Sequence, residues 1–314
     1  MSTFQQYQRV EYERKRHYEI DSKRIYPSST TILSVKANPA IPPWASKMAA
    51  QYAAEKNHGA LDELLLSFDK YPKKQWLKET IVKMVSMLQN ALSNEEYIKD
   101  VKGAPWRKSG DAMDIGTLVH DMISEFHIDE IKWRERGKEY SSAQAKNWFI
   151  MKLKSDEIRK KKLKKDVSTK LKNCLGQFLK WREDVNFVIV SSEFTVYSDD
   201  HKFAGTVDAL GYVNDKLTLV DYKTSSGIWP DYDLQTSSYL CALLEMIRRK
   251  QAPKLEDKPE QMCVVNFTKE GKLDTKMVEN YKEALNLFLA YKDSFNAKQI
   301  WEAKLKMALA EKNE

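Results

Sequence analysis

Three residues of one short segment, Asp208, Asp221 and Lys223, have the types and spacing that metal-assisted chemistry requires. They lie in the run FAGTVDALGYVNDKLTLVDYKTSS, in which Asn214 and Asp215 read as a two-residue hairpin turn. Such a turn sets Asp208 directly opposite Asp221 on the neighbouring strand. The segment therefore predicts two carboxylates side by side.

Opposed carboxylates on paired strands need a neutralising group. Their Cβ atoms lie about 4.5–5.5 Å apart, and like charges at that separation are destabilising. A divalent cation is the simplest neutraliser, and hard oxygen ligands at this density suit Mg²⁺ or Mn²⁺. Because side chains alternate along a strand, Lys223 shares the face of Asp221 and completes the set. Each residue alone also fits a surface carboxylate or an exposed ion pair, but the combination favours chemistry.

The elements around this set are predicted from hydrophobic periodicity. Apolar residues at helical spacing predict a helix from Ala112 to about Ile131. Three antiparallel strands are expected at residues 187–197, 203–213 and 216–224. A helix should follow at 233–250, a fourth strand at 262–267, and a long charged helix or helix pair from about residue 274 to the end. The first hundred or so residues read as mostly helical, after a polar, charged start.

Four short runs together resemble the RecB-like branch of the PD-(D/E)xK nuclease superfamily. The central runs are Gly205-Thr206-Val207-Asp208 and Asp221-Tyr222-Lys223-Thr224, flanked by GTLVH, which ends in His120, and by LQTSSY, which holds Gln235 and Tyr239. The resemblance covers roughly residues 112 to 250. It implies an α/β fold with a small mixed sheet flanked by helices, a restriction-endonuclease-like core at residues 111–314 and a mostly helical N-terminal subdomain at residues 1–110.

The resemblance also implies roles for individual residues. Asp208 and Asp221 would be metal ligands, Lys223 the catalytic lysine, and His120 a further ligand or near neighbour of the metal. Glu193 resembles the acidic residue often found on the preceding strand, but its face depends on an unresolved turn length.

A helix-borne pair completes the resemblance. Gln235 and Tyr239 are four residues apart, so they share a helix face that can approach the substrate or the catalytic strand. Alone, Tyr239 would read as an ordinary core aromatic and His120 as a satisfied core histidine.

Composition narrows the partner and the compartment. A formal net charge of +7 and a pI near 9.0 favour a polyanionic partner such as DNA. The basic run at residues 158–165 fits either a contact with the DNA backbone or the solvated face of a charged helix. Three widely spaced cysteines predict neither a disulfide framework nor a structural zinc site. Without a recognisable signal peptide or membrane span, we expect a soluble cytoplasmic protein, in the host cytoplasm if it is phage-encoded.

The predicted function is a Mg²⁺- or Mn²⁺-dependent DNA exonuclease that acts on single strands or DNA ends in recombination, repair or replication. No Gly-rich phosphate-binding loop is present, so unwinding would come from a partner: a helicase, with a recombinase or single-strand-binding protein as other candidates. Two alternatives stay open, a site-specific or structure-specific endonuclease and a non-catalytic DNA-binding assembly protein with a vestigial site.

Overall fold

The computed structural model describes residues 4, 6–12, 15–35, 95–155, 165–253, 255 and 257–310. The chain divides into two compact units, Met1–Lys36 with Ile115–Glu314 and Ala37–Asp114. Most of the expected N-terminal subdomain and nearly all of the basic run at 158–165 lie outside the described residues, so a domain boundary at residue 110 stays a prediction.

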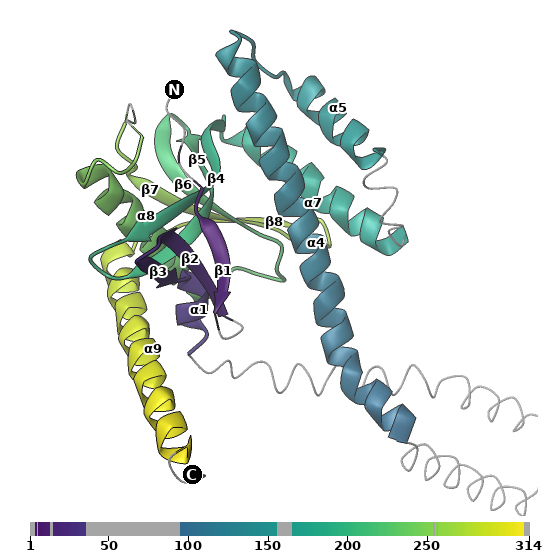
Figure 1. The fold of residues 1–314 in the computed structure, drawn as a ribbon. Helices are drawn as coiled ribbons and strands as arrows, with labels where there is room; N and C mark the ends of the chain where they lie inside the picture. Colours follow the sequence, from purple (N-terminus) through teal and green to yellow (C-terminus); the bar gives the residue numbers. More distant parts are fainter. Residues whose placement is uncertain are drawn as a thin grey trace, which may run out of the picture. The chain divides into compact units, whose positions relative to one another are not determined.

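A five-stranded mixed sheet forms the centre of the first unit (Figure 1). Its strands, in spatial and sequence order, are β4 (Val188–Ser198), β5 (Phe203–Val213), β6 (Lys216–Lys223), β7 (Gln261–Phe267) and β8 (Leu273–Met277). All neighbours are antiparallel except β6 and β7, which are parallel and joined through helix α8 (Pro230–Arg248). The predicted mixed sheet, with three antiparallel strands followed by a helix and a fourth strand, is confirmed.

The sheet separates two apolar cores. Leu219 and Val264 face one core, which the N-terminal strands, α1, α8 and α9 complete, while Val220 and Val265 face another built with α4, α5 and α7. This division follows from the alternation of side chains along each strand. The helices not yet located are α1 (Ser29–Leu33), α4 (Glu95–Glu135), α5 (Ser142–Leu153), α7 (Lys165–Asp184) and α9 (Tyr281–Ala310).

Two predicted helix boundaries were wrong. The helix expected from Ala112 is the longer α4, which runs through Pro105 although proline and glycine disfavour helix interiors. The helix expected from about Asp274 begins only at Tyr281, because the preceding residues form edge strand β8. A turn closed by the hydrogen bond from Gly271 N to Thr268 O, with Gly271 at a φ of 95°, reverses the chain and pairs β8 with β7.

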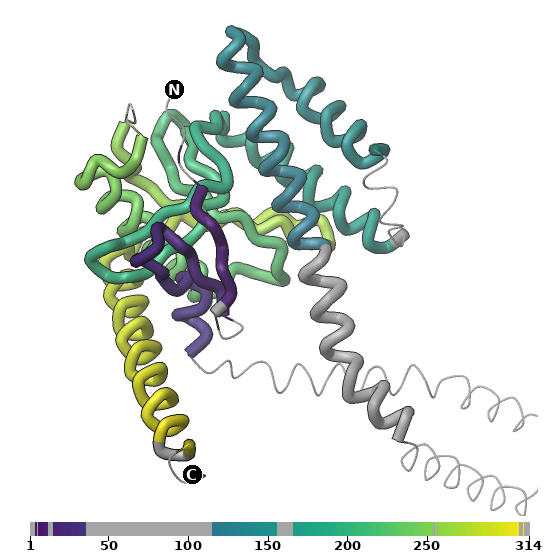
Figure 2. The backbone as a smooth tube through the Cα atoms, in the orientation of Figure 1, coloured from purple at the N-terminus to yellow at the C-terminus, as the bar shows by residue number. Residues whose placement is uncertain are grey.

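The described residues between 4 and 35 are mainly strand rather than helix. They form a second antiparallel sheet of β1 (Gln8–Tyr12), β2 (Lys15–Asp21) and β3 (Arg24–Pro27). Ser28 then caps α1 by accepting a hydrogen bond from Thr31 N, as the hydroxyl-rich run PSSTT permits. Ser28 also forms a parallel bridge with Ala204, which places this segment beside β5 (Figure 2).

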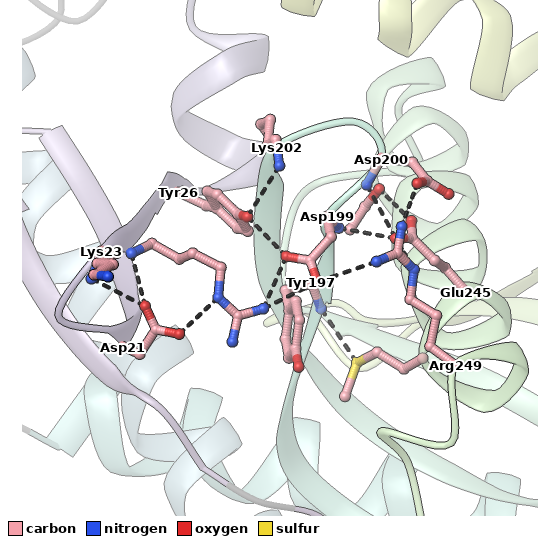
Figure 3. A network of polar contacts seen from close by, with 12 residues as sticks. Asp21, Lys23, Tyr26, Tyr197, Asp199, Asp200, Lys202, Glu245 and Arg249 are labelled. Carbon is pink, nitrogen blue, oxygen red and sulfur yellow. Dashed lines mark hydrogen bonds and ion pairs between the residues drawn. The ribbon is translucent and has the colours of Figure 1, made fainter.

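An ion-pair network joins the N-terminal sheet to the central sheet (Figure 3). Asp199, in the turn between β4 and β5, accepts hydrogen bonds from Arg24 at 2.9 Å and from the Tyr26 hydroxyl at 2.7 Å. Glu245 of α8 accepts from the backbone N–H of Asp199 and of Asp200 at 2.9 and 3.0 Å. Exposed ion pairs contribute only about 0–1 kcal/mol each. The network's main effect is therefore to fix where the N-terminal sheet lies.

Within the described residues, no helix has the length and the apolar character needed to span a membrane.

Candidate active site

The β5–β6 hairpin has the predicted turn and register. Asn214 and Asp215 both adopt positive φ, 47° and 64°, which is the conformation of a type I′ hairpin turn. The strands pair as predicted from Val213 with Lys216 up to Ala209 with Val220. The next position along each strand carries a carboxylate.

The first of these carboxylates, Asp208, is held from two directions. Its Oδ2 accepts a hydrogen bond of 2.7 Å from the backbone N–H of Tyr222, and its Oδ1 lies 3.5 Å from Nδ1 of His120 on α4. One ligand atom each from His120, Glu193 and Asp208 lie within 4.8 Å of one another. The structure thus brings together one imidazole and two carboxylates from three separate elements.

Glu193 lies opposite Asp208 across β4 and β5. Ser192 pairs with Ala209, and the register does not shift before the next pair, which resolves the face that sequence reasoning left open. Glu193 has a φ of 48°, an uncommon conformation for a residue other than glycine. Such conformations cost about 1–3 kcal/mol and concentrate at functional sites.

Asp221 and Lys223 form a separate pair on the same face of β6. Asp221 Oδ2 lies 2.5 Å from Lys223 Nζ, and both side chains are largely buried. Lys223 Nζ also lies 4.9 Å from the ring centroid of Tyr232. The group within 4.8 Å does not include Asp221, whose carboxylate lies against the lysine instead. Of the three predicted metal ligands, His120 and Asp208 thus lie together with Glu193, and a ligand role for Asp221 stays a prediction.

The electrostatics of the site favour bound positive charge. Burial and the nearby charge of Asp208 raise the pKa of Glu193 to about 7. Burial raises the pKa of Asp221 to about 6, although the Lys223 ammonium opposes the shift. Burial works against a charged His120, yet the charge of Asp208 outweighs it and raises the pKa of the imidazole.

The donor set fits a divalent cation. Carboxylate oxygens with one imidazole are ligands that Mg²⁺ accepts in part and Mn²⁺ accepts well. Asp221 Oδ1 is buried and has no hydrogen-bonding partner among the described residues, which leaves a carboxylate oxygen available at the edge of the cluster. His120, Glu193 and Asp208 would hold the ion, with Asp221 beside them.

Gln235 and Tyr239, on α8, line a cavity that His120, Glu193 and Asp208 also line. Gln235 Nε2 donates a 2.7 Å hydrogen bond to the Tyr239 hydroxyl, and Tyr239 itself is buried. The tyrosine ring packs against the backbone of Gly205, where an added Cβ would lie 2.1 Å from a ring carbon. The glycine is therefore required for this close approach.

Asn266 positions the chain just after β6, and sequence reasoning missed it. It is fully buried on β7, where it is the parallel partner of Lys223. Its side chain accepts from Ser225 N at 3.0 Å and donates to Ser225 O at 3.1 Å. An asparagine inside an apolar run was the available signal, since a buried amide requires such partners.

A cavity of about 540 Å³ contains the cluster and reveals residues that the motifs did not. Arg9, Arg16 and Tyr18 of the N-terminal sheet line it together with His120, Glu193, Asp208, Lys223, Gln235 and Tyr239. The alternating patterns QRVEY and KRHYEID could have indicated these strands. No sequence signal shows that they lie beside the acids.

Comparison with known proteins identifies the family of the chain. A model of the PD-(D/E)XK nuclease superfamily matches residues 96–311. The alkaline exonuclease LHK-Exo from Laribacter hongkongensis has a TM-score of 0.32 and 11% identity over 44% of this chain and 71% of its own. A protein named SSO0001 has a TM-score of 0.23 and 14% identity over 55% and 71%. No curated protein matches the sequence.

The family match spans well over half of the chain, and the protein belongs to the PD-(D/E)XK nuclease superfamily. This assignment rests on the family match and on the mixed sheet flanked by helices, not on the two distant structures.

Proposed function

We propose that the protein is a Mg²⁺- or Mn²⁺-dependent DNA exonuclease that hydrolyses phosphodiester bonds of single strands or DNA ends. The observation that carries the proposal is the approach of His120, Glu193 and Asp208 to within 4.8 Å, beside the Asp221–Lys223 pair, in a member of a nuclease superfamily. A net charge of +7 supports a polyanionic substrate.

Each residue of the site has a physical task in this proposal. A bound divalent cation supplies Lewis-acid chemistry for phosphodiester hydrolysis. The N–H of Tyr222 fixes Asp208 through Oδ2 and orients its other oxygen toward His120. Asp221 keeps Lys223 charged and in place, because its carboxylate outweighs burial and raises the pKa of that lysine.

The Lys223 ammonium then meets the negative charge that accumulates on phosphate during hydrolysis. A preorganised cation that is largely buried in the protein stabilises developing charge far better than one in bulk solvent.

The cellular setting is proposed on the resemblance of the four motifs. We place the enzyme in the cytoplasm, of the host if it is phage-encoded, and in recombination, repair or replication. A helicase, a recombinase or a single-strand-binding protein would present or protect the strand.

The test is digestion of end-labelled linear single- and double-stranded DNA beside a closed circle, with Mg²⁺, with Mn²⁺ and with EDTA. Wild type is compared with Lys223→Ala and with Lys216→Ala, which removes an exposed lysine at the other end of the same strand. The proposal expects metal-dependent loss of linear DNA from wild type and Lys216→Ala, and an intact circle. Cutting of the circle would refute the exonuclease and favour a site-specific or structure-specific endonuclease. DNA binding without any cutting would favour the non-catalytic assembly protein.

A further inference from the structure

One face of the N-terminal sheet presents two arginines to the cavity. Arg9 pairs with Tyr18 across β1 and β2, and Glu11 pairs with Arg16. Cross-strand partners share a face, as do residues two apart on one strand. Arg9, Arg16 and Tyr18 therefore lie on one face, and all three line the cavity that contains the acids.

Thr206 connects this face to the strand that carries Asp208. Its Oγ1 accepts a 2.9 Å hydrogen bond from Arg9 Nη2 and lies 2.8 Å from the Tyr18 hydroxyl. Thr206 is two residues before Asp208 on β5, so both point to the same face of the central sheet. The guanidinium of Arg9 is thereby held beside the candidate metal ligands, and its Nη2 is 3.7 Å from Glu193 Oε2.

The two arginines remain accessible, unlike the catalytic lysine. The side chain of Arg9 is 51% exposed, and Arg16 is also exposed. The Lys223 side chain is 16% exposed and lies against Asp221. An ion pair as long and as exposed as Arg9–Glu193 contributes about 0–1 kcal/mol, so it does not by itself account for an arginine at this position.

We propose that Arg9 and Arg16 form a phosphate-binding subsite that holds the DNA backbone next to the hydrolysed bond. The inference rests on the proposed function and names the residues that position its substrate. The planar guanidinium presents several N–H donors that match phosphate oxygens, and such contacts fix register without reading sequence. The ion-pair network around Asp199 keeps the sheet that carries both arginines in place (Figure 3).

The experiment measures binding and turnover separately. Affinity for a fluorescein-labelled single-stranded oligonucleotide is measured by anisotropy in the Asp221→Asn background at several salt concentrations, for Arg9→Gln, Arg16→Gln and Lys23→Gln. The last variant removes a charge from an exposed turn of the same sheet, away from the cavity. Steady-state cleavage is measured for the same three substitutions in the active enzyme, and thermal unfolding confirms that each variant is folded.

Each arginine variant is expected to weaken binding about tenfold, whatever the base sequence, and to reduce the salt slope by about 0.7. KM rises accordingly while kcat changes by less than about twofold. Arg9→Lys keeps the positive charge but loses the paired N–H donors of the guanidinium, so its affinity for DNA should lie between those of wild type and Arg9→Gln. Lys23→Gln behaves as wild type.

Oligonucleotides with and without a terminal phosphate identify the source of the phosphate. Loss of affinity only for the phosphorylated strand assigns the subsite to a strand end, and equal loss for both assigns it to an internal diester. The inference is overturned if both arginine variants bind with the affinity and salt slope of wild type, or if Lys23→Gln weakens binding as much as they do. A wild type that binds through these arginines without cutting would refute the proposed function and leave the subsite standing.

Discussion

Buried carboxylates lie on both faces of the central sheet, and they are neutralised differently. On the face of α4 and α7, burial works against ionised Glu130, but His127, whose Nδ1 lies 3.8 Å from Glu130 Oε2, and the charge of Arg182 outweigh it and hold the pKa below its usual value. On the cavity face, the pKa values of Glu193 and Asp221 are raised to about 7 and about 6. On the first face the charge of Arg182 favours the ionised carboxylate, whereas on the cavity face burial and the charge of Asp208 favour the protonated forms of Glu193 and Asp221.

Consecutive residues of β6 point to opposite faces of the sheet and so belong to these two different surroundings. Tyr222 points to the first face, where its hydroxyl lies 3.1 Å from His127 Nε2 and its ring contacts Phe178 and Phe267. Asp221 and Lys223 point to the other face, where Lys223 lines the cavity. Tyr222, Phe178 and Phe267 thus form a rigid aromatic backing behind the cavity face. A divalent cation would neutralise the buried carboxylates of that face.

The largest expected effect comes from removing the carboxylate that the cluster shares. Asp208→Asn lowers cleavage of linear single-stranded DNA by about a thousandfold or more, because a ligand and its charge are lost together. Initial rates measure it, with Asp184→Asn, an exposed aspartate on α7, as the control. If the initial cleavage rate of Asp208→Asn is within tenfold of the wild-type rate, the cavity face is not the catalytic site.

The second prediction concerns the free energy of unfolding when a buried glutamate on either face is replaced by uncharged glutamine. Glu130→Gln leaves the guanidinium of Arg182, 2.6 Å away, without its charged partner and costs about 3 kcal/mol of unfolding free energy. Glu193→Gln, which relieves repulsion with Asp208, leaves the metal-free protein as stable or more so. Urea unfolding of the metal-free proteins measures both, and equal losses would show that the faces are alike.

The pH dependence of stability should have opposite signs on the two faces. Glu193 binds its proton more tightly when folded, so its contribution is present below its ordinary value of 4.5 and is lost as pH rises through about 7. Burial lowers the pKa of His127, so its contribution is lost as pH falls through 6.5. Relative to wild type, the metal-free melting temperature of Glu193→Gln should gain with rising pH and that of His127→Gln should decline. Shifts of one sign in both variants would contradict this account.

The smallest expected effect tests whether the aromatic backing acts only as a support. Tyr222→Phe removes one hydroxyl and its contact with His127, at a cost of about 1 kcal/mol in unfolding free energy. Cleavage at saturating metal should stay within about twofold of wild type. A large drop in kcat with unchanged stability would mean that the hydroxyl communicates with the cavity face.

The sequence predicts those parts of the site that depend on local rules. The Asn214-Asp215 turn and the alternation of side chains were sufficient to align Asp208 with Asp221 and to place Lys223 on the same face. The turn, the register and the alternation depend only on residues close together in the chain, so a single sequence is enough to predict them.

The parts that depend on distant contacts were missed or left open. The face of Glu193 required the length of the turn before β5, and the approach of Arg9 required the packing of a short charged sheet against β5. Edge strand β8 was taken for helix because its charged residues, such as Asp274 and Lys276, suit either structure. The approach of His120 on α4 to Glu193 and Asp208 on two strands is likewise a tertiary result.

The central claim, that the cavity face holds a cation, is tested most directly by calorimetric titration of Mn²⁺ into the metal-free protein. Wild type, Asp184→Asn and Glu130→Gln, at a temperature where each is folded, should bind the ion with similar affinity. Asp208→Asn should weaken binding at least about tenfold, as loss of a charged ligand requires. If Asp208→Asn binds Mn²⁺ as wild type does, or if wild type binds none, the cavity face is not the metal site.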